Sequence, residues 1–275
     1  MAIFLVVLAA SVAALAPAFA QEEIPSQRKR LVENVTTEDV KRFLDPTRMI
    51  SRVSYDFQMN YLPTDVELMT HRLKPWLALS NSQAIWVEIP YLDFSLPLPG
   101  GPSGLGDMAV GWGIILHENN RKRLTTITTG LEVLLPTGDA DRGLSADKTV
   151  VSPGLAVATN PTDVFPVYIT TWYHHSIETE GASQRPGRPV RAFDIGLQTF
   201  HILPQGFFLA FLPTLVIDLE GGFNIFSLGL GAGRALNRRL LINAGYVQYV
   251  AGENTFNRGF TVGVTWLWGK DQGRQ

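Results

Sequence analysis

One pair of side chains has the spacing of a catalytic nucleophile and its base, namely His174 and Ser176. Residues two apart on a strand lie on the same face, so the imidazole would be placed to deprotonate the hydroxyl. Such a pair also needs a third group that orients the base, and a histidine pair at the rim of a barrel is more often interfacial. We predict that the chain is not an enzyme, and we rank a hydrolase that uses these two residues as the third alternative.

Charged side chains that alternate with large apolar ones form a second set of candidates. If the apolar faces point to lipid, the opposite faces line the lumen of a barrel, and charged rings set the selectivity of a pore. The pore-lining candidates are six acids and two bases: Asp56, Arg72, Lys74, Glu88, Asp107, Glu132, Asp194 and Asp218. They predict a net acidic path that prefers neutral or cationic solutes. The alternative, which stays open, is that these residues pair across the interior and fill it.

The sequence carries no signal for a metal, a cofactor or nucleic acid. There is no cysteine, and His71, His117 and His201 are isolated from one another, so we predict no metal site. The glycines of 229–233 do not open a helix within a βαβ unit, so they are no dinucleotide fingerprint and we predict no cofactor. A formal net charge of −2 argues against nucleic-acid binding.

The elements that must carry these residues are strands. In 258–268 every second residue from Phe260 to Trp268 is large and apolar, which is the period of a strand with one apolar face. The alternation predicts twelve strands, at about 49–61, 66–79, 84–96, 106–116, 124–136, 148–159, 164–177, 189–203, 207–219, 223–235, 240–250 and 258–268. Only a closed barrel satisfies the backbone groups of strands in lipid. We therefore predict an all-β fold, a transmembrane antiparallel up-and-down β-barrel of about twelve strands with a short helical or irregular N-terminal leader.

The ends of the chain differ from this pattern. The run that closes on Ala18-Phe19-Ala20 is typical of a secretory signal peptide, although no Lys or Arg precedes it, which leaves the true start codon open. Thr36 and Asp39 form a capping-box pattern that predicts about two turns of helix. The predicted segments are a signal peptide at 1–20, a periplasmic leader or plug with a short helix at 21–48, the transmembrane barrel at 49–269 and a C-terminal tail at 270–275.

The predicted connections fall into two groups. Counted from the first, the even connections are short, whereas most odd ones, such as 137–147 and 178–188, are longer and rich in Gly and charge. Short periplasmic turns, longer outer loops and an even strand number are typical of bacterial outer-membrane barrels. We predict a protein of the Gram-negative cell outer membrane with outer-membrane lipid as a partner and both termini in the periplasm.

Three short motifs, taken in order, resemble the outer-membrane proteins of the "MetA-pathway of phenol degradation" family. They are Gly104-Leu-Gly-Asp107, Leu134-Leu-Pro-Thr-Gly-Asp139 and Ser152-Pro-Gly-Leu-Ala-Val157. The resemblance implies a transporter-like β-barrel without catalytic residues, through which small compounds, hydrophobic or aromatic ones among them, pass passively. A closed structural or surface-interaction barrel is the first alternative, and the oligomeric state stays open.

The spacing of His174 and Ser176 is similar to that in outer-membrane phospholipase A, which is also a twelve-stranded barrel. The pattern of that enzyme expects an asparagine on the following strand, and the stretch 189–194 of this chain contains none. The resemblance therefore does not change the prediction that the chain is not an enzyme.

Overall fold

The computed structural model of the chain describes residues 35–62, 66–95, 101–119, 124–177, 189–220, 224–252 and 257–268. The predicted signal peptide, the leader residues before Val35 and the predicted tail lie outside the described residues. Among the residues that are described, none of the helices is long and apolar enough to cross a membrane.

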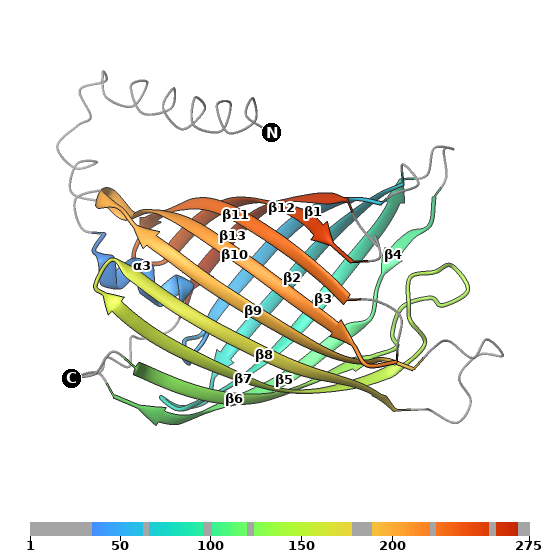
Figure 1. Cartoon of the computed structure of the whole chain (residues 1–275), viewed down its shortest axis with the longest axis horizontal. Coiled ribbons are helices and arrows are strands. Elements are labelled where there is room, and N and C mark those ends of the chain that lie inside the picture. The colour runs from blue at the N-terminus through green and yellow to red at the C-terminus, as the bar shows by residue number, and fades with distance from the viewer. Residues whose placement is uncertain are drawn as a thin grey trace, which may run out of the picture. The chain divides into compact units, whose positions relative to one another are not determined.

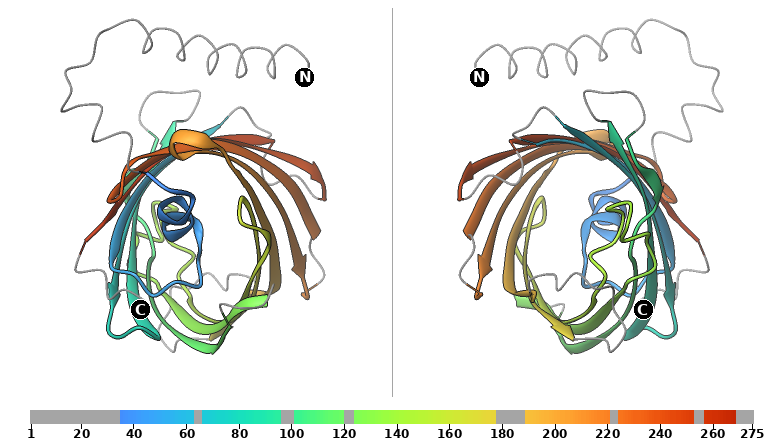
Figure 2. Two further views of the ribbon diagram at one scale, coloured as in Figure 1. Left: turned by 90° about the vertical axis from the view of Figure 1, so that its left-hand side faces the viewer. Right: turned by 90° about the vertical axis from the view of Figure 1, so that its right-hand side faces the viewer.

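Twelve long strands and the short strand β4 (Ser103–Leu105) form one antiparallel sheet that closes on itself (Figures 1 and 2). The long strands are β1 (Arg52–Tyr61), β2 (Glu67–Ala78), β3 (Gln83–Ser95), β5 (Met108–Glu118), β6 (Leu124–Leu135), β7 (Thr149–Thr162), β8 (Phe165–Ile177), β9 (Arg191–Ile202), β10 (Phe207–Asp218), β11 (Asn224–Asn237), β12 (Leu240–Ala251) and β13 (Arg258–Leu267). Each long strand pairs with its neighbours along the chain, and β1 pairs with β13 to close the ring. The predicted all-β barrel of about twelve strands is confirmed.

Prolines inside the strands coincide with gaps in the hydrogen-bond ladders. Pro75 pairs with β1, whereas the pairing of β2 with β3 skips it. The pairing of β7 with β8 skips Pro153, and the pairing of β9 with β10 skips Pro213, although both residues pair on their other side. Proline has no N–H to donate, so a strand accommodates it where one neighbour forgoes a bond.

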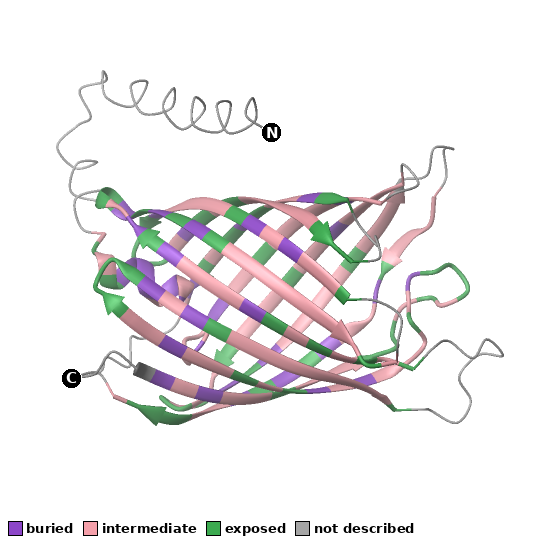
Figure 3. Ribbon diagram, in the orientation of Figure 1, coloured by how far each residue is buried: buried purple, intermediate pink, exposed green. Residues whose placement is uncertain are grey.

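The outer face is apolar on every long strand. Each of the twelve carries at least one exposed large apolar side chain, for example Leu77, Leu209 and Val262, which are 46, 50 and 54% exposed. Exposed and buried positions alternate over parts of the strands, for example along the first five residues of β10 (Figure 3). Apolar surface of this extent is rare on soluble monomers, whereas a lipid-facing band requires it.

The one α-helix of the described residues, α3 (Thr37–Leu44), lies inside the barrel at one end (Figure 2). Its first turn is closed by a capping box, because the Thr36 hydroxyl accepts the N–H of Asp39 at 3.2 Å and the Asp39 carboxylate accepts the N–H of Thr36 at 2.9 Å. The short helix predicted from this pattern is confirmed. Its side chains Val40 and Phe43 are buried.

The helix lies at the end of the barrel where β1 begins and β13 ends (Figure 1). The described turns at this end are short, at 79–82, 163–164, 203–206 and 238–239, and the third includes the 3₁₀ turn η1 (Pro204–Gly206). The connection between β6 and β7 at the opposite end is longer, at 136–148. This long connection thus lies at the end that the sequence predicts, although the connections 62–66 and 219–223 at the same end are short.

Candidate functional site

A ladder of charged side chains crosses the inner face of β2, β3 and β6. The Glu88 carboxylate accepts a hydrogen bond from Nζ of Lys74 at 2.9 Å and forms an ion pair with Nε of Arg72, also at 2.9 Å. The ammonium of Lys74 also lies 3.8 Å from the carboxylate of Glu132. Two bases and two acids thus neutralise one another along this one wall of the barrel.

A glycine on the inner face of β5 lets two non-neighbouring strands meet. Trp86 of β3 reaches across Gly111 and donates its Nε1–H to the carboxylate of Glu132 on β6 at 2.7 Å. A Cβ atom at Gly111 would lie 2.0 Å from Cε2 of the indole. Any larger residue at this position would therefore push Trp86 away from Glu132.

Stacked aromatic rings continue the same wall. The rings of Trp76 and Trp86 are stacked with centroids 4.4 Å apart and planes 18° apart. The guanidinium carbon of Arg52 lies 4.5 Å from the Trp76 ring, and Nζ of Lys74 lies 5.9 and 6.0 Å from the two rings. These distances are in the range of cation–π attraction, so the stack already has cationic partners within the protein.

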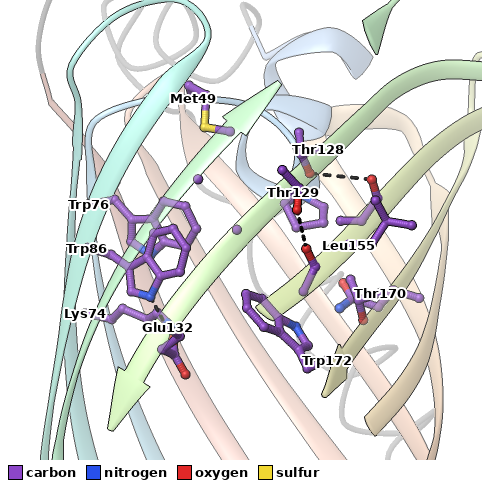
Figure 4. A pocket seen from close by; sticks show the side chains of 16 residues that line it. Met49, Lys74, Trp76, Trp86, Thr128, Thr129, Glu132, Leu155, Thr170 and Trp172 are labelled. Atoms are coloured by element: carbon purple, nitrogen blue, oxygen red, sulfur yellow. Dashed lines mark hydrogen bonds and ion pairs between the residues drawn. The ribbon is translucent and has the colours of Figure 1, made fainter. Parts of the chain in front are cut away.

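A third tryptophan faces this stack across a cavity of about 200 Å³ (Figure 4). Trp172 of β8 lies on Gly154 of β7, where a Cβ atom would be 2.3 Å from the indole. The cavity is lined by Trp76, Trp86 and Trp172, and by Pro46 and Met49 from the segment that follows α3. The lumen thus contains an aromatic-walled space next to the charged ladder.

The helix α3 packs against the inner wall at its own end of the barrel. Val40 and Phe43 belong to a buried apolar cluster that includes side chains from seven consecutive strands, β7 to β13. Members of this cluster include Tyr168 of β8, Phe208 of β10 and Leu267 of β13. Full burial of one such apolar side chain contributes about 1.5–3 kcal/mol to stability. The burial of Val40 and Phe43 is therefore the main contact that holds the helix.

Ion pairs hold the polar side of the helical segment. Arg48 pairs with Glu38 and, at 3.5 Å, with Asp45, and Asp39 lies 3.8 Å from Arg238 in the turn between β11 and β12. Burial alone would lower the pKa of the Arg48 guanidinium, but the two carboxylates outweigh it and the pKa is raised. The charge of Arg48 is therefore permanent, and its removal would leave two carboxylates uncompensated.

The residues of the hydrolase hypothesis each have another partner. Nδ1 of His174 lies 2.8 Å from the hydroxyl of Ser152 on the neighbouring strand, and the Ser176 hydroxyl accepts the N–H of Val190 at 2.8 Å. The His174–Ser176 pair is therefore not formed in this arrangement. Among the described residues there is also no group of three or more His, Cys, Asp or Glu side chains that would hold a metal ion.

The remaining pore-lining candidates occupy different environments. Asp56 lies on the inner face of β1, where a Cβ atom at Gly263 would be 2.4 Å from its carboxylate, and Asp194 lies opposite Trp172 in the pairing of β8 with β9. Asp218 ends β10 and accepts the N–H of Glu220 at 3.0 Å. Asp56 also lies directly opposite Arg72 in the pairing of β1 with β2, so it adjoins the ladder around Glu88, whereas Asp194 and Asp218 are separate from it.

Asp107 does not line the lumen wall but holds a loop in place. It lies between β4 and β5, and its carboxylate accepts the N–H of Gly138 at 3.1 Å and that of Ala146 at 2.9 Å. The Asp107 side chain therefore stabilises the connection 136–148 by bonding to two of its backbone N–H groups.

Trp76 and Trp86 were not among the site residues predicted from the sequence, although each lies two positions from a charged candidate, Lys74 and Glu88. Arg52, Met49 and Trp172 were not predicted either. One signal in the sequence could have indicated the tryptophans. A large aromatic residue on the polar face of a strand points into the lumen and not toward lipid, so it is a candidate for a lumen site. The contribution of Met49 depends on the position of α3 in the lumen and has no signal in the strand pattern.

No protein-family model and no curated protein sequence matches the chain. Solved structures do resemble it. An outer-membrane channel from Pseudomonas putida F1 is 10% identical with a TM-score of 0.62, covering 82% of this chain and 98% of that one. The KdgM porin (9% identical, TM-score 0.55, 79% and 99% covered) and the NanC porin (10%, 0.55, 78% and 98%) are also similar. At these identities the likeness establishes the fold, which is the β-barrel that outer-membrane porins and channels share.

Proposed function

We propose that the chain is an outer-membrane channel for the passive passage of small solutes, and that α3 and the segment after it restrict the path. The observation that carries this proposal is the opposite character of the two faces of the barrel. Every long strand presents apolar side chains outward, whereas the inner face holds charged, hydroxyl and indole groups around a cavity. A barrel in lipid with a polar interior is the architecture of a pore.

The end of the barrel with α3 and the short turns would face the periplasm. Bacterial barrels place short turns and both chain ends there, and the longer connection 136–148 would then lie outside. The resemblance to the phenol-degradation family supports small hydrophobic or aromatic compounds as solutes. One KdgM structure is a complex with oligogalacturonate, a polyanion. In this chain Arg72 and Lys74 are both paired with Glu88, which does not favour such a solute.

Single-channel recording in planar bilayers tests the proposal. The refolded protein is compared with Phe43→Asp, which places a charge in the apolar contact that holds α3, and with Thr37→Ala as a control on the same helix. We expect discrete steps that are larger in Phe43→Asp than in the wild type and the control. Silence from all three proteins, despite folded barrels by circular dichroism, would instead favour a closed structural barrel.

A further inference from the structure

We propose that the cavity between Trp76, Trp86 and Trp172 binds a neutral, flat aromatic molecule of one or two fused rings that carries at least one hydrogen-bonding group. The inference rests on the proposed function in one respect, because a solute must enter the lumen to reach the cavity. It adds the class of solute and the residues that recognise it.

The size and shape of the cavity favour a small flat ring. Its volume is about 200 Å³, and an engineered apolar cavity of about 150 Å³ in another protein accommodates benzene. Its lining includes Gly113, Gly130 and Gly154, which offer no side chains to fill it. A Cβ atom at Gly130 would lie 3.4 Å from the Trp86 ring and 3.5 Å from the Trp172 ring, so this glycine separates the two indoles. A flat molecule can therefore lie between indole groups over a floor of backbone.

The charges around the cavity favour a neutral ligand. Lys74 already lies over the Trp76 and Trp86 rings, so a cationic ligand would meet an ammonium where it needs an aromatic face. Glu132 already accepts the indole N–H of Trp86, so an anionic ligand would meet a carboxylate. A neutral molecule avoids both repulsions.

Four of the polar side chains that line the cavity already form hydrogen bonds within the protein, namely Lys74, Thr128, Thr129 and Glu132. Within the described part of the chain, the side chains of Thr170 and Gln198 form no hydrogen bond, although both line the cavity. Thr128 already donates to the carbonyl of Ala156 at 3.5 Å. A sugar ring would bring several hydroxyl groups that need partners, whereas an aromatic ring with one or two polar substituents would need only what Thr170 and Gln198 supply.

The segment after α3 completes the site. Pro46 and Met49 line the cavity, and the terminal methyl carbon of Met49 lies 3.6 Å from the position that a Cβ atom of Gly113 would take. The binding site is therefore whole only while α3 occupies the lumen. Ligand binding and the seated helix stabilise each other, since a ligand that binds one state better shifts the protein toward that state.

Calorimetric titration of the refolded full-length protein with indole tests the inference. We expect saturable binding that weakens at least about tenfold in Trp172→Leu, because the variant removes an aromatic wall. The matched control is Trp112→Leu, which removes the same side chain from the outer face, where Trp112 is 40% exposed. Met49→Asp, which puts a charge in the lining, gives a second test should Trp172→Leu fail to refold.

Three further probes define the ligand class. Tryptamine and indole-3-acetate carry the same ring with a positive and a negative charge, and we expect each to bind at least about tenfold more weakly than indole. Glucose is expected not to bind. Saturable glucose binding without indole binding would overturn the inference, and so would equal indole affinity in the wild type and Trp172→Leu, or no saturable binding at all. Conductance of the same preparations separates the two proposals, because channel steps without indole binding reject the site alone, whereas indole binding without steps rejects the channel.

Discussion

The carboxylate of Glu88 accepts a hydrogen bond from Nζ of Lys74 at 2.9 Å, and its other oxygen forms an ion pair with Nε of Arg72 at the same distance. Glu88 is therefore shared by two bases of the lumen wall, and Lys74 also lies 3.8 Å from Glu132. In Glu88→Gln both cations lose this partner, so the reversal potential in a potassium chloride gradient should move toward anion selectivity. Asp141→Asn makes the same charge change in an exposed loop and should leave the potential unchanged. An equal shift in both variants would show that Glu88 does not set selectivity.

The close contact between Gly111 and Trp86 predicts a destabilised variant. A methyl group in Gly111→Ala would overlap the indole, and overpacking of this kind costs about 1–3 kcal/mol. Gly245→Ala is the matched control, because its nearest neighbour would be a carbonyl oxygen at 3.4 Å. Urea unfolding in detergent measures both, and near-ultraviolet circular dichroism should lose the signal of the stacked Trp76–Trp86 pair in the first variant alone. Equal midpoints for the two variants would contradict the prediction.

The capping box predicts how firmly α3 is held. Thr36→Ala removes the hydroxyl that accepts the N–H of Asp39 and should cost about 1 kcal/mol of helix stability. Trypsin cleavage after Lys41 and Arg42, followed by mass spectrometry, should then be about fivefold faster than in the wild type. Thr36→Ser keeps the cap and should cleave at the wild-type rate. A serine variant as labile as the alanine variant would show that the cap is not what matters.

The partners of His174 and Ser176 predict that the protein releases no fatty acid from phospholipid vesicles. Ser176 accepts a backbone N–H, and His174 is engaged by Ser152, so neither is placed as a nucleophile–base pair. Hydrolysis that disappears in Ser176→Ala would restore the enzyme hypothesis. Activity that disappears in Ser152→Ala but survives in Ser176→Ala would identify the other serine as the nucleophile.

The strands were predictable because period-two alternation is local. Leu77 and Lys74, which lie on opposite strand faces by their spacing, are found exposed and half-covered, as a barrel in lipid requires. The helix was predictable for a similar reason, since the Thr36–Asp39 pattern acts within one turn. Element types thus follow from short-range sequence patterns.

The contacts that build the site were not predictable in this way. Trp86 and Glu132 are 46 positions apart and belong to strands that do not pair with each other. They meet because Gly111 on the intervening strand leaves the space open, which depends on the register of β3 with β5 and of β5 with β6. Sequence patterns predict on which face of its strand a residue lies. Which side chains of that face come into contact depends on strand order and register.

The pairing of β1 with β13 has a consequence for biogenesis. The ring cannot close until the last strand is in place, because that strand supplies the partner of the first. Val40 and Phe43 share their buried cluster with Leu267 of β13 and Leu241 of β12. The surface that α3 occupies is therefore complete only after β13 has joined β1, so the helix gains its full set of buried contacts only in the sealed cylinder.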